Sequence, residues 1–527
     1  AGRVVTFSRE SGSCVGGSCV CLLKWLRDFT HLNELIMNEE QFEKCLGANA
    51  APYIYGLPAC LKSFTLVLRT AFLRWMNKKW RSDYSLAQAT PNLRSLRFGE
   101  WEGLEDAVDS LVKIDKTFAA TPFAQFMSSL PPNLETLLLP PLSHTMQANL
   151  LPASITRSSI ALKWPASLDG VSVPKHLVSL SLFIHDSAVL ERSAKEMFPP
   201  SLTDLRVHLR VKEDAAEATK PKWIAKLPAV STLHLTNIDN LVLSELPSVL
   251  TSLTLVYFYP SKGKFDSKGW SPEYLTKFSV KRWPPLDDLG SLPKCIDHLV
   301  LKTEHQCSLT KMPESLTRFT VPANASFASP HWPTRLHTLV INPLTTVNSD
   351  VLITFPKSLT SVSFSVPANA DVTNLFQDLP TSIKHLILWN RKLDGGIFAA
   401  LKASHLESLE IYPGDAKKDL IAVEISRWKW SLLEDLPPTL KLLRLPVASD
   451  SFEAVALPNL SHLLIHNTIV GFEPLQLALV LFPNIRRILA KEFKIEANEI
   501  DNANKVISSN PLLTLRSISQ ATDKKKN

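Results

Sequence analysis

The sequence lacks any apolar run long enough to form a membrane-spanning helix. Such a helix needs about 18 or more consecutive apolar residues, and polar residues interrupt every stretch of that length in this chain. Glycine is scarce, with 16 residues among 527, whereas proline is frequent, with 37. Hydrophobic residues make up 45% of the chain and charged residues 20%. This balance excludes an intrinsically disordered protein.

Cysteine is also infrequent, and its number is odd. Of the seven cysteines, Cys14, Cys19 and Cys21 lie close together near the start and the other four are scattered. This distribution excludes a disulfide framework and favours a reducing compartment. We therefore expect an intracellular location, cytoplasmic or organellar, over secretion.

Motifs that carry chemistry are absent as well. The three early cysteines lack the second pair that a structural zinc site requires, and the glycines near Gly12 lack the Gly-Lys-Ser/Thr of a phosphate-binding loop. His462 and His466 are four residues apart, which is ~13 Å along a strand and too far to share a metal. We therefore predict that the protein is not an enzyme and uses no cofactor or metal.

A phrase of the form Leu-Pro-x-x-Leu-x-x-Leu-x-Leu recurs along the chain. It is most regular where Pro293, Pro313 and Pro333 open three repeats at intervals of 20 residues (313 − 293 and 333 − 313). The apolar positions after these prolines keep one frame: Ile296, Leu299, Leu301; Leu316, Phe319, Val321; Leu336, Leu339, Ile341. About seventeen repeats extend over residues 57–490. Self-similarity at a period of roughly 20–29 residues predicts a solenoid.

The chemistry of the phrase predicts one short strand in each repeat. The two leucines of Leu-x-Leu point to the same side of a strand, and the leucine three residues earlier joins the same core. Proline has no N–H for a sheet ladder, so it belongs at the strand entry. Because one repeat cannot bury its leucines alone, the repeats must stack into a parallel sheet over a continuous core.

The phrase resembles the repeats of the leucine-rich repeat superfamily. Its Pro-x-Ser-Leu-Thr variant, which contains Leu316 and Leu359, is similar to irregular repeats of protists that are related to the FNIP type. The Phe-Asn-x-x-Ile half of that type is not present, and the asparagine typical of the superfamily has an equivalent at Asn324 but not in most other repeats. The resemblance implies an α/β solenoid: an irregular leucine-rich-repeat arc with a parallel β-sheet on the concave face and loops or short helices on the convex face.

The extent of the phrase divides the chain into three segments. Residues 1–50 do not fit the repeat and are expected to form an N-terminal cap region, because terminal repeats need a polar outer face. An F-box-like adaptor is the alternative for this segment, but its usual Leu-Pro-x-Glu opening is absent. Residues 51–490 are expected to form the solenoid, and residues 491–527 a C-terminal cap and a basic tail.

Strand alternation also names the side chains that face away from the core. These predict a partner-binding surface on the concave face: Arg206, His208, His234, Lys277, Lys281, His298, Lys302, Arg318, His385, Trp389, Glu410 and Tyr412. Four of these residues form a basic stripe around His298, and two are aromatic, as interface hot spots often are. The alternative is an ordinary solvated face, with the aromatic side chains shielded by neighbouring loops.

The predicted surface favours a function in protein binding. We expect a non-catalytic protein–protein interaction scaffold that binds through its concave face, as a subunit of a larger assembly. With a net charge of +7, an acidic patch is a fitting partner surface. One alternative is a reversible substrate-recognition receptor of the ubiquitin-ligase adaptor type. Another is an accessory subunit of a ribonucleoprotein, although Asp204 and Glu410 among the cations argue against a nucleic-acid groove.

Overall fold

The structure is a computed structural model, and the statements below concern the residues that it describes. These are residues 3–6, 32–38, 57–67, 85–98, 126–138, 151–162, 173–184, 190–191, 198–209, 221–238, 241–256, 272–281, 289, 292–302, 307–308, 312–321, 325–326, 331–341, 355–366, 379–390, 401, 404–413, 436–445, 457–470, 478–480, 482–494 and 514–517. Asn324 and the cysteines at 14, 19 and 21 lie outside these ranges.

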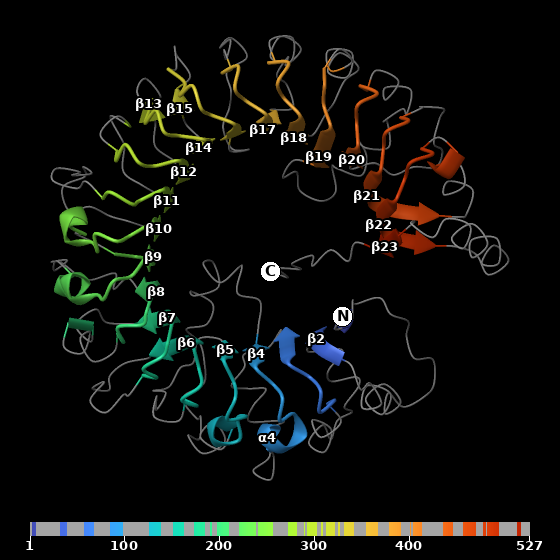
Figure 1. Cartoon of the computed structure of the whole chain (residues 1–527). Coiled ribbons are helices and arrows are strands. Elements are labelled where there is room, and N and C mark those ends of the chain that lie inside the picture. The colour runs from blue at the N-terminus through green and yellow to red at the C-terminus, as the bar shows by residue number, and fades with distance from the viewer. Residues whose placement is uncertain are drawn as a thin grey trace, which may run out of the picture. The chain divides into compact units, whose positions relative to one another are not determined.

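The chain forms two compact units. The N-terminal unit comprises Ala1–Lys262 and Lys268–Leu275, and the C-terminal unit comprises Gly263–Ser267 and Thr276–Asn527. Within each unit, the strands follow one another in chain order as a parallel solenoid with little helix (Figure 1).

The N-terminal unit contains ten of the described strands. They are β1 (Arg3–Thr6), β2 (Leu32–Asn38), β3 (Ser63–Val67), β4 (Ser95–Phe98), β5 (Thr136–Leu138), β6 (Arg157–Leu162), β7 (Ser179–Ile184), β8 (Asp204–Leu209), β9 (Thr232–Thr236) and β10 (Ser252–Val256). Each strand pairs in parallel with the next one along the chain. Because β1 and β2 lie within residues 1–50, the ladder begins upstream of the first complete phrase.

The C-terminal unit continues in the same manner. Its ladder consists of β11 (Lys277–Lys281), β12 (His298–Lys302), β14 (Arg318–Val321), β16 (Thr338–Ile341), β17 (Ser361–Val366), β18 (His385–Asn390), β19 (Ser408–Pro413), β20 (Leu442–Leu445), β21 (His462–Val470), β22 (Arg487–Lys494) and β23 (Thr514–Ser517). A separate parallel pair joins β13 (Cys307–Ser308) to β15 (Ala325–Ser326).

The strand leucines form columns across the repeats, as the phrase predicts. In the register of the ladder, Leu386 lies opposite Leu409, which in turn lies opposite Leu443, and all three are fully buried. Leu406 and Ile411, from a repeat that has no proline, are buried in the same way. Burial of this continuous column of apolar side chains is the main favourable term that holds neighbouring repeats together.

Proline opens a turn at the entry of most repeats. The carbonyl of Pro313 accepts a hydrogen bond of 3.1 Å from the backbone N–H of Leu316, and the same bond recurs from Leu336 to Pro333 and from Leu359 to Pro356. The turn lets the chain reverse before the strand, and proline favours it because its φ is already restricted. The proline of the phrase therefore favours the turn. Because it lies before the strand, its lack of an N–H costs no hydrogen bond of the sheet.

A polar ladder that the phrase did not predict joins the turns. The residue just before the first leucine donates a side-chain hydrogen bond to a backbone carbonyl of the preceding repeat. The donors are Cys60, Asn92, Ser154, Ser201, Ser315, Ser358, Ser382, Thr439, Asn459 and Asn484. This ladder explains the serine in the Pro-x-Ser-Leu-Thr variant, because the hydroxyl satisfies carbonyls that would otherwise be left without partners.

The strand β6 was not among the predicted repeats. Its turn has the usual proline, Pro152, but Ser158 occupies the position of the first strand leucine and is 2% exposed. Ser158 lies opposite Leu180 in the register, so the column of leucines is interrupted by a serine at this point. A search for Leu-x-Leu fails here because the apolar alternation is broken.

Short helices precede turns in the N-terminal unit, and three of them have bounds within the described residues. They are α4 (Leu86–Ala89), η4 (Lys222–Lys226) and η5 (Leu243–Glu245). Each contributes an apolar side chain to the core: Leu86, Trp223 and Leu243 are buried. Within the described residues, no helix has the length and apolar character needed to cross a membrane.

Candidate functional site: the non-core face of the sheet

We use the name non-core face for the side of each sheet that lies opposite the buried leucines. All twelve residues predicted to bind a partner lie on strands, and the described side chains among them are exposed or half-buried. The side chains of Lys281 and Lys302 are outside the described set, although their backbones are paired in register. The structure does not bring the twelve residues into one site; they form separate groups on different strands.

In the N-terminal unit, the group lies on β8 and β9. The rings of His208 and His234 have centroids 5.3 Å apart and are tilted by 42°. Asp204 Oδ2 accepts a hydrogen bond of 3.0 Å from the Ser179 hydroxyl, and Asp204 Oδ1 lies 4.0 Å from Nε of Arg206. The aspartate thus partly balances the arginine, and this group has no strong net charge.

In the C-terminal unit, the first group is a row of basic side chains. Lys277, His298 and Arg318 lie on β11, β12 and β14 and oppose one another directly in the register. Burial, followed by the positive charges of Lys277 and Arg318, lowers the pKa of His298 below 6.5, while Asp297 acts in the opposite direction. The row therefore places the positive charges of Lys277 and Arg318 on either side of a histidine that is mostly neutral at pH 7.

The second group of the C-terminal unit is aromatic. Trp389 on β18 stacks on Tyr412 of β19, with ring centroids 4.3 Å apart and an angle of 14° between the planes. The guanidinium carbon of Arg444 on β20 lies 4.2 Å from the centroid of the Tyr412 ring. Such cation–π contacts contribute about 0.5–2 kcal/mol, so the three side chains support one another across three strands.

Polar contacts hold this aromatic group in place. The Tyr412 hydroxyl donates a hydrogen bond of 2.8 Å to Glu410 Oε2, and Arg444 contacts both that carboxylate, at 3.4 Å, and the tyrosine hydroxyl. Burial and the hydrogen bond to Glu410 raise the pKa of Tyr412 to about 12. Because Arg444 neutralises Glu410, the carboxylate adds no net negative charge to the group.

Sequence reasoning missed Arg444 as part of this group. Its signal was present, since Arg444 lies between Leu443 and Leu445 and so points away from the core like the residues that were predicted. The half-buried apolar residue Leu442 on the same face was also missed.

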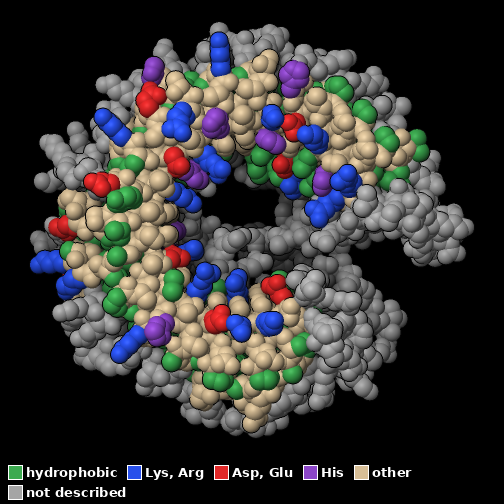
Figure 2. Space-filling model, in the orientation of Figure 1, with side chains coloured by type: hydrophobic (Ala, Val, Ile, Leu, Met, Phe, Trp, Pro, Cys, Tyr) green, Lys and Arg blue, Asp and Glu red, His purple; other side chains and the backbone are tan. Residues whose placement is uncertain are grey.

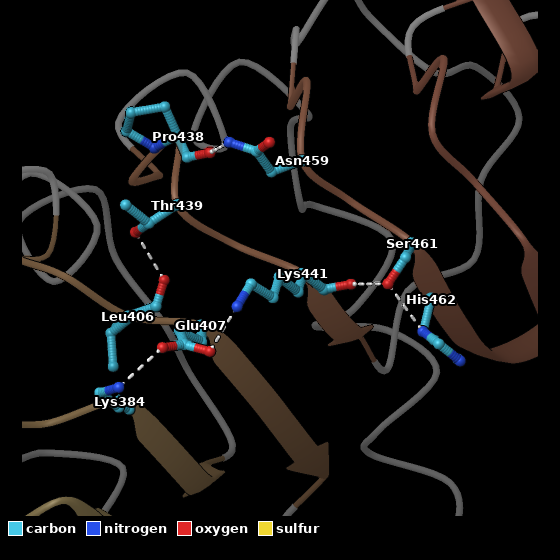
Figure 3. A network of polar contacts seen from close by, with 9 residues as sticks. All are labelled: Lys384, Leu406, Glu407, Pro438, Thr439, Lys441, Asn459, Ser461 and His462. Carbon is cyan, nitrogen blue, oxygen red and sulfur yellow. Dashed lines mark hydrogen bonds and ion pairs between the residues drawn. The ribbon is translucent and has the colours of Figure 1, made fainter.

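A third group is made of charged side chains, one from the residue that precedes each of the strands β18, β19 and β20. Glu407 Oε1 is 3.1 Å from Lys384 Nζ, and Glu407 Oε2 is 2.7 Å from Lys441 Nζ (Figure 3). The hydrogen bonds from Lys441 and Lys384 lower the pKa of Glu407 to about 2. This Lys–Glu–Lys ladder links three successive repeats, and because its side chains are largely exposed, solvent screening keeps its contribution small.

Groups of His, Cys, Asp or Glu that could hold a metal ion do not occur within the described ranges. The contacts on the non-core face are stacking, cation–π and ion-pair contacts. They can hold a partner by stacking and by charge. The described residues also include a contact of 2.8 Å between the Ser461 hydroxyl and Nδ1 of His462, where β21 begins (Figure 3).

The repeated phrase, the leucine columns and the parallel ladder together define a leucine-rich-repeat solenoid. No protein-family model matches the sequence, and no curated protein matches it. Solved structures similar to the chain include CroV588, described as a novel circular leucine-rich-repeat protein, with 16% identity, coverage of 88% of this chain and 67% of that chain, and a TM-score of 0.38. An internalin (InlF) from Listeria monocytogenes has 15% identity, covers 69% of this chain and 87% of that chain, and has a TM-score of 0.25.

Proposed function

We propose that this protein is a non-catalytic protein-binding scaffold that holds its partner on the non-core face of the sheet, as a subunit of a larger assembly. The observation that carries this proposal is that different positions of each repeat have different roles. Leucines serve the core and turn residues serve the polar ladder, whereas one register row of the non-core face reads Ser279, Val300, Thr320 and Val340. Positions that are not needed for stacking can vary to suit a partner.

The chemistry of the face favours a protein partner. Stacked aromatic rings and arginine are the side chains most often found at interface hot spots, and they lie together on β18–β20. In solenoids of this kind the sheet provides an extended concave binding surface, and the lysine and arginine side chains would suit an acidic patch on the partner. We also propose that the repeats belong to the irregular FNIP-related type, on the evidence of the Pro-x-Ser-Leu-Thr variant.

A co-purification experiment tests the function. The full chain is purified natively at low and at high salt, and the retained proteins are identified by mass spectrometry with their stoichiometry. In parallel, the variant V340R/I387R places two charges on the non-core face, and the control variant K294E/K357E changes two exposed turn residues outside it.

We expect a fixed set of proteins to remain with the wild type and with the turn control at both salt concentrations. The non-core variant should lose this set while its circular dichroism spectrum is unchanged. Loss of all partners at high salt would favour a reversible receptor over a permanent subunit. Retention of RNA alone, or equal retention of proteins by the non-core variant, would overturn the proposal.

A further inference from the structure

The sheet of the C-terminal unit carries two chemically different patches on one face. The cationic strip consists of Lys277, His298 and Arg318 on β11, β12 and β14. The aromatic platform consists of Ile387, Trp389, Tyr412 and Leu442 on β18, β19 and β20. The strands between them, β16 and β17, carry Thr338 and Ser361 in the row of the strip.

The register row of the strip contains no acidic residue. From β11 to β22 it reads Lys277, His298, Arg318, Thr338, Ser361, His385, Ser408, Leu442, His462 and Arg487. Figure 2 shows Lys, Arg and His side chains recurring along the described surface, with acidic side chains between some of them. In sequence, the acidic residue nearest to the strip is Asp297, which precedes β12 and is half-buried. The strip therefore presents to an anion the positive charges of Lys277 and Arg318, with the imidazole of His298 between them.

The platform offers apolar contact without net charge. Its members are half-buried, and Trp389 and Tyr412 are held flat against each other by stacking. Glu410 and Arg444 lie on the same face in the register row of Ile387, and their opposite charges balance each other at 3.4 Å. A rigid aromatic surface of this kind loses little conformational entropy when an apolar side chain binds to it.

The spacing of the two patches sets the length of a ligand that can reach both. From β14 to β18 the ladder takes three steps, through β16 and β17, which is ~14 Å at ~4.8 Å for each strand. Trp389 also lies four residues further along β18 than His385, which shares the row of the strip, and this adds ~13 Å in the strand direction. The diagonal of the two is ~20 Å, which an extended peptide covers with about six residues.

We propose that the C-terminal unit binds an extended acidic segment of a partner protein, with the acidic residues on the cationic strip and an aromatic or aliphatic anchor about six residues away on the aromatic platform. The inference rests on the proposed scaffold function and specifies its partner. Charge complementarity favours this occupant. The strip has basic or neutral side chains, which suit acidic residues, and the platform is neutral, which suits an apolar anchor.

Labelled peptides provide the direct test on the whole 527-residue chain. The probe carries three glutamates, a spacer of about six Gly/Ser residues that matches the distance of ~20 Å, and a Phe-Leu anchor, and its affinity is measured by fluorescence anisotropy. Three control peptides replace glutamate by lysine, replace Phe-Leu by Gly-Gly, or omit the spacer. We expect each control to bind about tenfold more weakly, which corresponds to about 1.4 kcal/mol, because each control prevents one end of the peptide from reaching its patch.

Variants of the protein assign the two ends of the peptide. K277Q/R318Q should weaken the probe about tenfold and reduce the dependence of its affinity on salt. W389S should weaken the probe but leave the Gly-Gly peptide unaffected, and L442S serves as a second platform variant if W389S does not fold. The turn control K294Q/K357Q should bind like the wild type.

Three outcomes would overturn the inference. The first is equal affinity for peptides with and without the anchor, and the second is unchanged affinity in the strip variant. The third is tighter binding of single-stranded oligouridylate than of the probe, which would indicate nucleic acid as the ligand. If the partner proteins of the whole chain are retained by both patch variants but lost from V340R/I387R, this inference fails while the scaffold function stands.

Discussion

His298 shows how side chains on neighbouring strands change the pKa of a single residue. Its own strand gives it no unusual chemistry, but the parallel register places Lys277 on one side and Arg318 on the other. Burial and these two cations keep the imidazole neutral by lowering its pKa. In the unfolded chain, the same histidine would titrate near 6.5.

The depressed pKa of His298 predicts a pH dependence of stability. Because the folded state holds the proton less tightly than the unfolded state, this contribution is complete above pH 6.5 and is lost as the pH falls below it towards the folded pKa. K277Q should raise the pKa of His298 and reduce that loss. The pKa is measured by NMR titration of histidine ring signals, with the His298 signal assigned through H298Q.

The exposed turn residue Lys294 provides the control for this prediction, since it is not among the causes of the shift. K294Q should leave the titration of His298 unchanged. An unaltered titration in K277Q would show that the register does not couple the two side chains.

Ser158 is a second residue whose behaviour depends on its place in the fold. It is 2% exposed, and its hydroxyl has no hydrogen-bond partner among the described residues. S158A should therefore raise the free energy of unfolding by about 1 kcal/mol, because a buried hydroxyl without a partner is unfavourable.

Ser129 is the matched control, because it is also buried but donates a hydrogen bond of 2.7 Å to the carbonyl of Phe126. S129A should lower the free energy of unfolding by about 0.5–1.5 kcal/mol. Both values come from urea unfolding followed by circular dichroism. Destabilisation by S158A equal to that by S129A would contradict the assignment of Ser158.

At the scale of the repeat, the turn and the strand make separate contributions. The hydroxyl of Ser382 lies 2.7 Å from the carbonyl oxygen of Leu359 and 2.8 Å from that of Lys357, so it ties one turn to the preceding one. Ser361 lies in the strand β17 on the non-core face, and its position in the repeat is not one that donates to the preceding turn. The two serines differ in function although they have the same side chain.

This difference predicts unequal effects of removing the two hydroxyls. S382A should lower the free energy of unfolding by about 0.5–1.5 kcal/mol, since the preceding carbonyls lose their donor. S361A should change it by less than about 0.5 kcal/mol, as expected for a side chain away from such contacts. Thermal and urea unfolding measure both, and equal effects would show that the turn ladder adds no stability.

At the scale of the whole molecule, stability passes from each repeat to its neighbours. Leu233 on β9 is 1% exposed and lies between Leu205 of β8 and Leu253 of β10 in the leucine column. L233A should cost about 2–5 kcal/mol locally. Because contacts in a solenoid join adjacent repeats, amide exchange should increase most in β8–β10 and progressively less towards β3.

Hydrogen–deuterium exchange with mass spectrometry measures this gradient. The control T232A changes a half-buried residue of the same strand that faces away from the core and should have little effect. A uniform increase of exchange over every strand of the N-terminal unit would indicate that the unit unfolds as one cooperative body instead.

The periodic leucines were sufficient to predict the parallel ladder, the buried columns and the direction in which Trp389 and Tyr412 point. The reason is local: alternation along a strand decides which side chains share a face, and stacking of repeats follows from the need to bury them. The phrase failed where a leucine was replaced, at Ser158, and could not predict the donors of the turn ladder.

Contacts across repeats came from the folded structure. The Lys384–Glu407–Lys441 ladder and the stacking of Arg444 on Tyr412 join residues whose separation in sequence varies from repeat to repeat. From Leu409 to Leu443 the interval is 34 residues (443 − 409), compared with 20 in the most regular repeats. The register sets which residues are partners across strands, and it depends on how intervening segments of unequal length are accommodated. Alternation within one strand therefore predicts which face a residue occupies. It does not predict the neighbour of that residue on the next strand.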